Sequence, residues 1–94
     1  MAMYAVVGSS DIDLERTEEA ESVVRDQLIP RISQAPGFVS ATFTRSAEGK
    51  GHSMVVFDSE EAAQAVGANA AGMLPADGPI TLLSIEVCQV TGSA

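Results

Sequence analysis

The hydrophobic period of this chain switches between that of a strand and that of a helix, and the order of the switches restricts the folds open to it. Apolar residues alternate with polar ones where a half-buried strand is expected, and recur at every third or fourth position where an amphipathic helix is expected. The strand-like runs are residues 3–7, 38–45, 52–57 and 80–90, and the helical runs are 11–34 and 59–71. The predicted order is therefore β-α-β-β-α-β.

The run 11–34 gives the clearest helical signal. Its apolar residues are spaced by four, with one neighbour beside them: Ala20, Val23, Val24, Leu28 and Ile32. Gly8-Ser9-Ser10 reads as the preceding loop, and Asp11 or Asp13 as the N-cap. Pro30 lacks an amide hydrogen and its ring crowds the preceding turn, so a kink is expected over residues 26–30.

The second helix begins at a predicted capping box formed by Asp58 and Glu61. It is rich in alanine, which lets a helix lie close to a sheet, and Gly72 is a candidate for its C-terminal stop. The predicted inward-facing stripe consists of Ala62, Val66, Ala70 and Met73.

The strand runs assign side chains to faces because successive residues point to opposite sides. In the second strand one face is predicted to carry Val39, Ala41 and Phe43. In the last strand one face is predicted to carry Leu83, Ile85 and Val87, and the other Leu82, Ser84, Glu86, Cys88 and Val90.

Right-handed crossovers place both helices on the same face of a four-stranded antiparallel sheet in the order 4-1-3-2, which is a ferredoxin-like α+β fold. The whole chain, 1–94, is expected to form one such domain with a frayed tail at 91–94. The other face of the sheet would expose Met54, Val56, Leu82 and Val90. A domain of this size buries only about 60% of its unfolded surface. We therefore expect a second copy to cover that face, giving a homodimer.

Charge excludes several partners. The net charge of -8 comes from 13 acidic and 5 scattered basic residues, so neither nucleic acid nor an anionic membrane surface is an expected partner. One cysteine, Cys88, forms no internal disulfide, and the N-terminus has no apolar leader, which predicts a cytoplasmic protein. One histidine and one cysteine supply no metal set, and no glycine-rich loop matches a phosphate-binding motif, so no cofactor is expected.

Two segments carry a resemblance to a known family. The first is a kinked helix that leads through Pro36-Gly37-Phe38 into a strand, and the second is the run 55–62 that leads into the second helix. Together they resemble the dimeric α/β-barrel superfamily, and within it the antibiotic-biosynthesis-monooxygenase-like (ABM) domains. This resemblance implies two ferredoxin-like protomers packed sheet to sheet as a dimeric α/β barrel.

The resemblance also implies a ligand pocket between the sheet and the helices of each protomer. The residues expected to line it are Phe43, Phe57, Ile85, Val24, Leu28, Val66 and Ala70. Haem-degrading relatives carry a tryptophan on the third strand and a histidine late in the second helix. This chain has Phe57 at the first position and no histidine in that helix, which argues against haem degradation.

Four residues are candidates for a catalytic role. His52 is the single histidine and could move protons near neutral pH, although its place at the start of a strand also suits an ordinary surface residue. Glu86 interrupts an apolar strand, and Tyr4 is a candidate donor to its carboxylate, in a catalytic or a structural contact. Asn69 could point into the helix-sheet cleft, although helical spacing places it beside the apolar stripe, on the surface.

Two functional hypotheses follow. The first is a cofactor-independent monooxygenase-like protein that acts on an aromatic or polyketide-type small molecule, in which the electron-rich substrate itself activates oxygen. The second is a non-catalytic dimeric module that binds a small hydrophobic ligand or a protein partner. An open cavity with convergent polar groups would favour the first hypothesis, and a closed, dry core the second.

Overall fold

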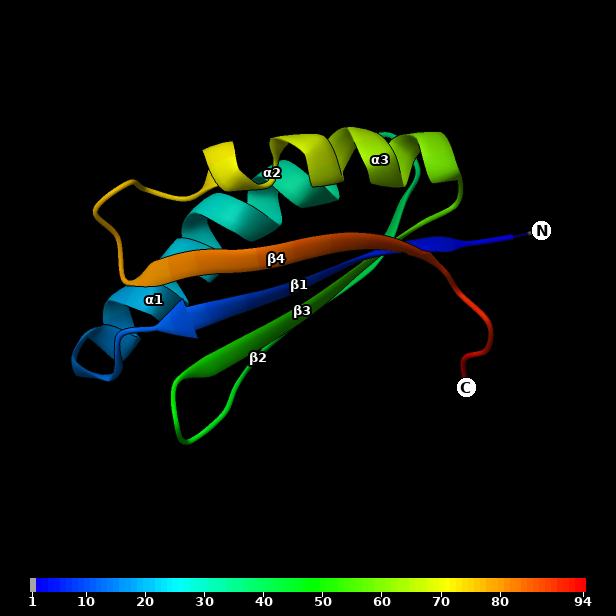
Figure 1. Ribbon diagram of the computed structural model, residues 1–94. Helices are drawn as coiled ribbons and strands as arrows, with labels where there is room; N and C mark the ends of the chain where they lie inside the picture. The colour runs from blue at the N-terminus through cyan, green and yellow to red at the C-terminus, as the bar shows by residue number, and fades with distance from the viewer. Residues whose placement is uncertain (1) are drawn as a thin grey trace.

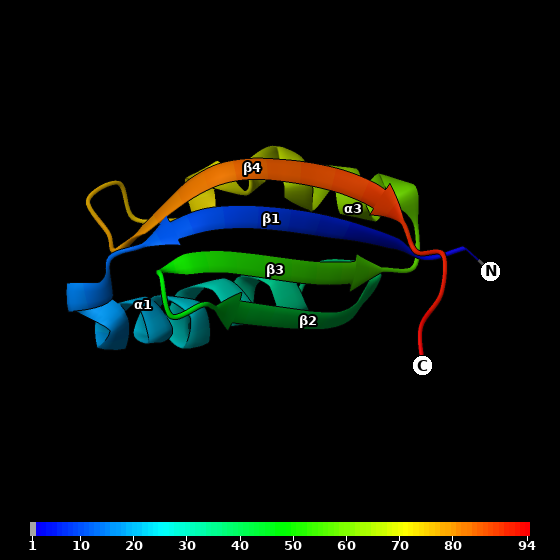
Figure 2. The same ribbon diagram turned by 60° about the horizontal axis from the view of Figure 1, so that its bottom comes forward.

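One antiparallel sheet of four strands forms a single layer of the molecule. The computed structural model describes residues 2–94. The strands are β1 (Tyr4–Ile12), β2 (Phe38–Arg45), β3 (Lys50–Phe57) and β4 (Ile80–Gln89). They lie in the order β2-β3-β1-β4, which confirms the predicted order read from the opposite edge (Figure 2).

Two helical segments cover one face of this sheet (Figure 1). The first comprises η1 (Leu14–Arg16), α1 (Thr17–Val23), η2 (Val24–Leu28) and α2 (Ile29–Ser33), and the second α3 (Glu60–Asn69) and η3 (Ala71–Met73). The α3 helix packs on β1 and β4, and α2 on β2. The predicted ferredoxin-like α+β fold is thereby confirmed. Within residues 2–94, no helix combines the length and the apolarity needed to cross a membrane.

The first strand is longer than predicted. β1 runs on to Ile12, so Gly8-Ser9-Ser10 is strand and the loop prediction is wrong. β1 is a central strand, and β3 and β4 hydrogen-bond to it on both sides, which overrides the weak strand propensity of glycine and serine. Asp11 therefore lies within the strand, and the cap is Asp13, whose Oδ1 accepts a hydrogen bond from the Glu15 amide at 3.0 Å.

The distortion that Pro30 is expected to cause over residues 26–30 takes the form of a π-helical turn that begins and ends two residues earlier. Proline has no N–H to donate to the carbonyl four residues earlier, and its ring crowds that carbonyl. The chain responds with one wide turn, a π-helix over Val24–Leu28, in which the Ile29 amide donates to the Val24 carbonyl. Ala20, Val23, Leu28 and Ile32 are buried under this helix, as the helical spacing predicts.

Two bulges correct the predicted faces. The register of β2 against β3 shifts between Phe38 and Ser40, so Val39 is bulged out and 48% exposed rather than inward-facing. A second shift, between β1 and β4, skips Leu83, which is 53% exposed. Beyond that bulge the alternation is inverted, and Leu82 faces the helices instead of the uncovered face.

The second helix begins and ends differently from the prediction. Its N-cap is Ser59, whose hydroxyl accepts from the Ala62 amide at 3.2 Å, and not Asp58. Val66 of the predicted stripe is buried, together with Ala63 rather than Ala62. Gly72 adopts no left-handed conformation, and the helix continues through η3 to the extended Leu74.

The largest fully buried side chain lies at the end of the sheet where β1 begins. Phe57 is completely buried there and meets Phe38 edge to face, with ring centroids 6.2 Å apart. Val6, Val55 and Val66 belong to the same core cluster. This packed end joins both helices to the two central strands.

We predict that Phe57→Ala destabilises the fold by about 3–5 kcal/mol, because it leaves a cavity that the surrounding strands and helices cannot close. Val39→Ala, at the exposed bulge, should cost less than about 1 kcal/mol. Urea unfolding followed by circular dichroism measures both values. Equal losses in the two variants would contradict this account of the core.

Within residues 2–94, no helix or strand packs on the face of the sheet opposite the helices. Its inner rows hold Ala5, Val7 and Val56 beside Met54, which is 49% exposed. Polar side chains of β2 and β4 border these apolar residues, so the face has an apolar centre and a polar rim.

Candidate functional site

A cavity of about 100 Å³ lies between the helices and the sheet, at the end away from Phe57. Most of its lining is apolar. Its volume is large enough for several water molecules, since one water needs roughly 10–15 Å³. The sheet contributes Val6, Gly8, Ser9, Ser10, Ile12, Phe43, Thr44, Gly51, His52, Ser53, Val55, Ile80, Leu82 and Ile85. The helical layer contributes Val24, Leu28, Ile32, Ala70, Met73 and Leu74.

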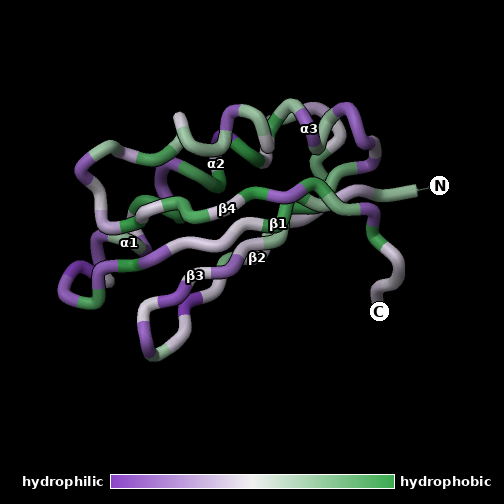
Figure 3. The backbone as a smooth tube through the Cα atoms, in the orientation of Figure 1, coloured by the Kyte–Doolittle hydropathy of each residue, from purple (hydrophilic) through white to green (hydrophobic). Residues whose placement is uncertain are grey.

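The floor of the cavity is low because four small residues adjoin on the two central strands. Gly8 pairs with Ser53, and Ser10 pairs with Gly51. Strand alternation places all four on the face that the helices cover. Figure 3 shows the change along β1, which is apolar near the N-terminus and nearly neutral in hydropathy further on. We call these four residues the Gly/Ser block.

Each hydroxyl of the block lies over the glycine of the neighbouring strand. A methyl group on Gly8 would come within 2.8 Å of the Ser53 hydroxyl, and one on Gly51 would collide with the Ser10 hydroxyl. Neither hydroxyl makes a hydrogen bond to another of the described residues, 2–94. Two polar groups in an apolar cavity are therefore free to bind a ligand.

The roof comes from the π-helical turn and from η3. Val24 and Leu28 lie on the first of these elements and Met73 on the second. Leu74 continues the roof into the loop before β4. The position of the roof thus depends on the wide turn that Pro30 imposes.

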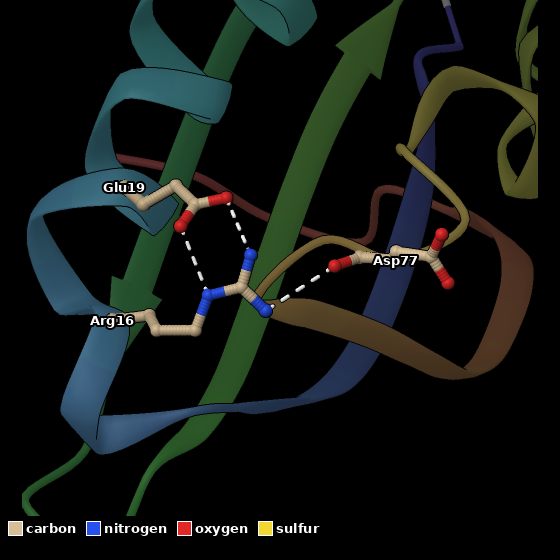
Figure 4. A network of polar contacts seen from close by, with 3 residues as sticks. All are labelled: Arg16, Glu19 and Asp77. Carbon is tan, nitrogen blue, oxygen red and sulfur yellow. Dashed lines mark hydrogen bonds and ion pairs between the residues drawn. The ribbon is translucent and has the colours of Figure 1, made fainter.

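A polar clamp holds that loop to the start of the first helix (Figure 4). Arg16 donates to both carboxylate oxygens of Glu19, at 2.9 and 2.6 Å, and to the Asp77 carbonyl at 3.2 Å. The Asp13 amide also donates to the Pro79 carbonyl at 2.9 Å. The hydrogen bond to Glu19 raises the pKa of Arg16.

The cavity adjoins a recess of about 290 Å³ next to α1. The two hollows share five lining residues, Ile12, Val24, Phe43, Thr44 and Ile80. Glu21 of α1 and Arg45 of β2 also line the recess, and Arg45 Nη1 lies 3.7 Å from Glu21 Oε1. These two residues form the charged mouth of an otherwise apolar space.

The predicted pocket is largely correct. Five of its residues line the cavity: Phe43, Ile85, Val24, Leu28 and Ala70. Phe57 and Val66, which belong to the core cluster, do not line it. The early end assigned to β1 left Gly8, Ser9, Ser10 and Ile12 out of the predicted strand, and with them half of the Gly/Ser block.

The four predicted catalytic residues do not converge on one point. Tyr4 packs against the core cluster on the helix side and pairs with Phe57, whereas Glu86 is exposed on the uncovered face opposite Val7. The suggested contact between Tyr4 and Glu86 is therefore wrong. Asn69 is exposed, and its Nδ2 donates to the Ala65 carbonyl at 2.9 Å.

His52 alone of the four borders the cavity. It is exposed, and strand alternation directs its ring to the uncovered face between Thr44 and Ser9. Thr44 donates to its backbone carbonyl at 2.8 Å. Within residues 2–94, no group of three or more histidine, cysteine, aspartate or glutamate residues is placed to hold a metal ion.

Sequence reasoning missed several residues of the site, among them Ser10, Ser53 and Arg45. The two serines were assigned to a loop and to an ordinary strand position. The spacing of small residues in both central strands, at positions 8 and 10 and at 51 and 53, carried the missing signal.

Comparison with solved structures shows which known proteins share this fold. The chain has the ferredoxin-like fold of ABM-type proteins, so the resemblance found in the sequence is confirmed for the fold. No protein-family model matches the sequence. A search of curated proteins likewise gives no significant match.

Three solved structures illustrate the similarity. The haem-degrader MhuD of Mycobacterium tuberculosis, with two haems in its active site, superposes with a TM-score of 0.72 at 18% identity, over 97% of this chain and 98% of that one. An assigned antibiotic biosynthesis monooxygenase of Bordetella bronchiseptica gives 0.69 at 16% identity, over 100% of both chains. A Streptomyces coelicolor monooxygenase in complex with nanaomycin D gives 0.61 at 18%, over 99% and 90%.

The free hydroxyl of Ser53 leads to a stability prediction. Ser53→Val should stabilise the fold by about 0.5–1 kcal/mol, because it replaces a hydroxyl without a protein partner by apolar volume above Gly8. Thermal unfolding measures the change.

Ser9→Val is the matched control. The Ser9 hydroxyl is 2.5 Å from that of Ser84, so its removal breaks a hydrogen bond. No stabilisation is expected there. If Ser53→Val destabilised the protein as much as Ser9→Val, the Ser53 hydroxyl would have a structural partner and the cavity floor would be misassigned.

Proposed function

We propose that this protein is a cofactor-independent, monooxygenase-like protein that binds an aromatic or polyketide-type small molecule in the helix-sheet cavity. The observation that carries the proposal is the Gly/Ser block, which opens an apolar cavity and leaves two unused hydroxyls in its floor. The likeness to a monooxygenase crystallised with nanaomycin D supports it.

The cavity suits a planar, mostly apolar molecule with one polar edge. The Ser10 and Ser53 hydroxyls can each donate to a carbonyl or phenol oxygen and accept from a phenol. Phe43 and Ile85 offer apolar contact to the rest of the molecule. Such contacts orient an electron-rich ring and keep water from its reactive carbon.

The reaction needs little from the protein when the substrate supplies the electrons. In an anthrone, loss of a methylene proton gives a carbanion that reduces O₂. One oxygen atom becomes the new carbonyl oxygen, and the other leaves as water with the two methylene hydrogens. His52 borders the cavity, but its ring points to the other face of the sheet, so water at the mouth of the cavity is the proposed proton acceptor and His52 stays a predicted catalytic residue. Tyr4, Asn69 and Glu86 stay predicted catalytic residues. Oxygen uptake by a single variant at each position would test them.

Haem is a poor candidate substrate for this cavity. The chain has one histidine, His52. The alternation of side chains along β3 points its ring to the other face of the sheet. Phe57, which stands where haem-degrading relatives have a tryptophan, is completely buried in the packed core. These residues offer neither an axial histidine nor an aromatic wall to haem.

Filling the cavity tests the proposal directly. Ala70→Leu adds volume at the roof, and we expect it to lower both anthrone binding and oxygen uptake at least about tenfold, because the ligand and the added side chain compete for the same space. Binding is measured by fluorescence, and turnover with an oxygen electrode on a panel of anthrones and quinols.

Ala68→Leu is the control, since Ala68 lies on the exposed side of the same helix. It should leave binding and oxygen uptake unchanged. Equal loss in both variants would indicate a general effect on the helix. Absence of oxygen uptake by the unchanged protein on the whole panel would contradict the monooxygenase proposal.

The second candidate function is a binding module without catalysis. It is favoured by the chemistry of the lining, because His52 is the one titratable side chain among the residues of the cavity, and its ring faces away from it. Binding of anthrones that Ala70→Leu weakens, without any uptake of oxygen, would support the binding module and not the enzyme.

We propose further that the protein is a homodimer whose uncovered sheet faces pack together. Apolar Val7, Met54 and Val56 lie at the centre of that face and polar residues at its rim, which is the usual arrangement of an interface. Burial of this centre would add the apolar contact that a domain of this size lacks on its own.

Met54→Glu should convert the dimer to a monomer, because two carboxylates would be buried near the symmetry axis without partners. Light scattering after size-exclusion chromatography at micromolar concentration measures the mass. Ile29→Glu, at a helical position 40% exposed on the opposite side, should leave the dimer intact. A folded, monomeric unchanged protein would refute the sheet-to-sheet assembly.

A further inference from the structure

We infer that the ligand of the cavity carries a carboxylate or another anionic oxygen group, and that Arg45 at the mouth binds it. This inference rests on the proposed function, because it assumes that the helix-sheet cavity is the binding site. It adds the chemical class of the ligand, an apolar ring system ending in an acid.

The position of Arg45 is fixed by the strand register. Arg45 is the last residue of β2 and pairs with Gly51, and Gly51 pairs with Ser10 on its other side. The three residues form one row on the helix-facing side of the sheet, across the floor of the cavity. Gly51 has no side chain of its own, and the space above it is shared by the Ser10 hydroxyl and the end of the Ile12 side chain, whose Cδ1 would lie 2.9 Å from a methyl group on Gly51.

The bonding of Arg45 differs from that of the other paired cations. Arg16 contacts Glu19 at 2.6 Å, and Lys50 contacts Asp11 at the same distance, each with a hydrogen bond. Arg45 lies 3.7 Å from Glu21, beyond hydrogen-bonding distance. Within residues 2–94, its guanidinium donates no hydrogen bond, although it has five N–H groups in a geometry that matches a carboxylate.

The surroundings of Arg45 make it a selective group. It is the one cationic residue among those that line the cavity and the adjoining recess. The chain as a whole has a net charge of -8, so an anion has few other places to bind. Its side chain is 36% exposed, less than that of Glu21 at 63%, so a ligand leaving the apolar space meets the guanidinium at the boundary with water.

Glu21 then competes with the ligand for Arg45. A long, solvent-exposed ion pair contributes little free energy, so an incoming carboxylate that makes two hydrogen bonds can replace it. The residual charge of Glu21 repels the same carboxylate. Removal of the charge of Arg45 should therefore lower the affinity for an anionic ligand, and removal of the charge of Glu21 should raise it.

The test uses two probes of nearly equal shape, 2-naphthoate and its neutral methyl ester, with binding measured by calorimetry. We expect the unchanged protein to prefer the acid. Arg45→Gln should weaken naphthoate binding about fivefold and leave the ester unaffected, and Glu21→Gln should tighten naphthoate binding about threefold. Arg31→Gln, the same change of charge at an exposed helical position away from the cavity, should alter neither.

Three other outcomes overturn the inference. Equal weakening by Arg45→Gln and Arg31→Gln would reduce the effect to net charge. Equal loss of both probes in Arg45→Gln would make Arg45 part of the cavity wall, and a preference for the ester would exclude an acidic ligand. In these cases binding of the ester still measures whether the cavity takes an apolar ligand, so the proposed function is tested independently of the inference. If neither probe bound to the unchanged protein, the cavity itself would be refuted as a ligand site.

Discussion

The contact between the two central strands at the Gly/Ser block is the constraint on which the site depends. Val6 and Val55 fill the space under the helices at one end of these strands, and Gly8 and Ser53 leave it empty at the other. The helical layer cannot sink into the vacated space, because it is fixed at the packed end by Phe57 and at the far end by the Arg16 clamp. A cavity results from short side chains between two supported ends.

Much of the fold could be predicted from sequence, because it follows from period and from connection rules. Helical spacing identified four buried residues of the first helix, and Pro30 predicted its distortion correctly. The order of the elements, with right-handed crossovers, then fixed the strand order. Many residues indicate the same elements, so one wrongly assigned residue does not change the predicted order of helices and strands.

The site was harder to predict, because it lies where local signals and tertiary context disagree. Gly8-Ser9-Ser10 has the composition of a turn, yet it forms a central strand because both neighbours supply hydrogen bonds. The bulges at Val39 and Leu83 depend on pairing between distant segments, and no local pattern announces them. Because β1 was predicted to end at residue 7, Gly8 and Ser10 were not expected in the cavity floor, and the predicted site included Glu86, which lies on the other face.

The two ends of the sheet are linked through strand register. A shift of one residue would turn every side chain of a strand to the opposite face. For β3, it would place His52 and Met54 beneath the helices and expose Val55 and Phe57. The packed end opposes this shift, because Phe57 is completely buried and the shift would expose it to water. The dense core therefore determines where Ser53 and Gly51 face, and substitutions at the hollow end can alter ligand binding while the packed end retains the fold.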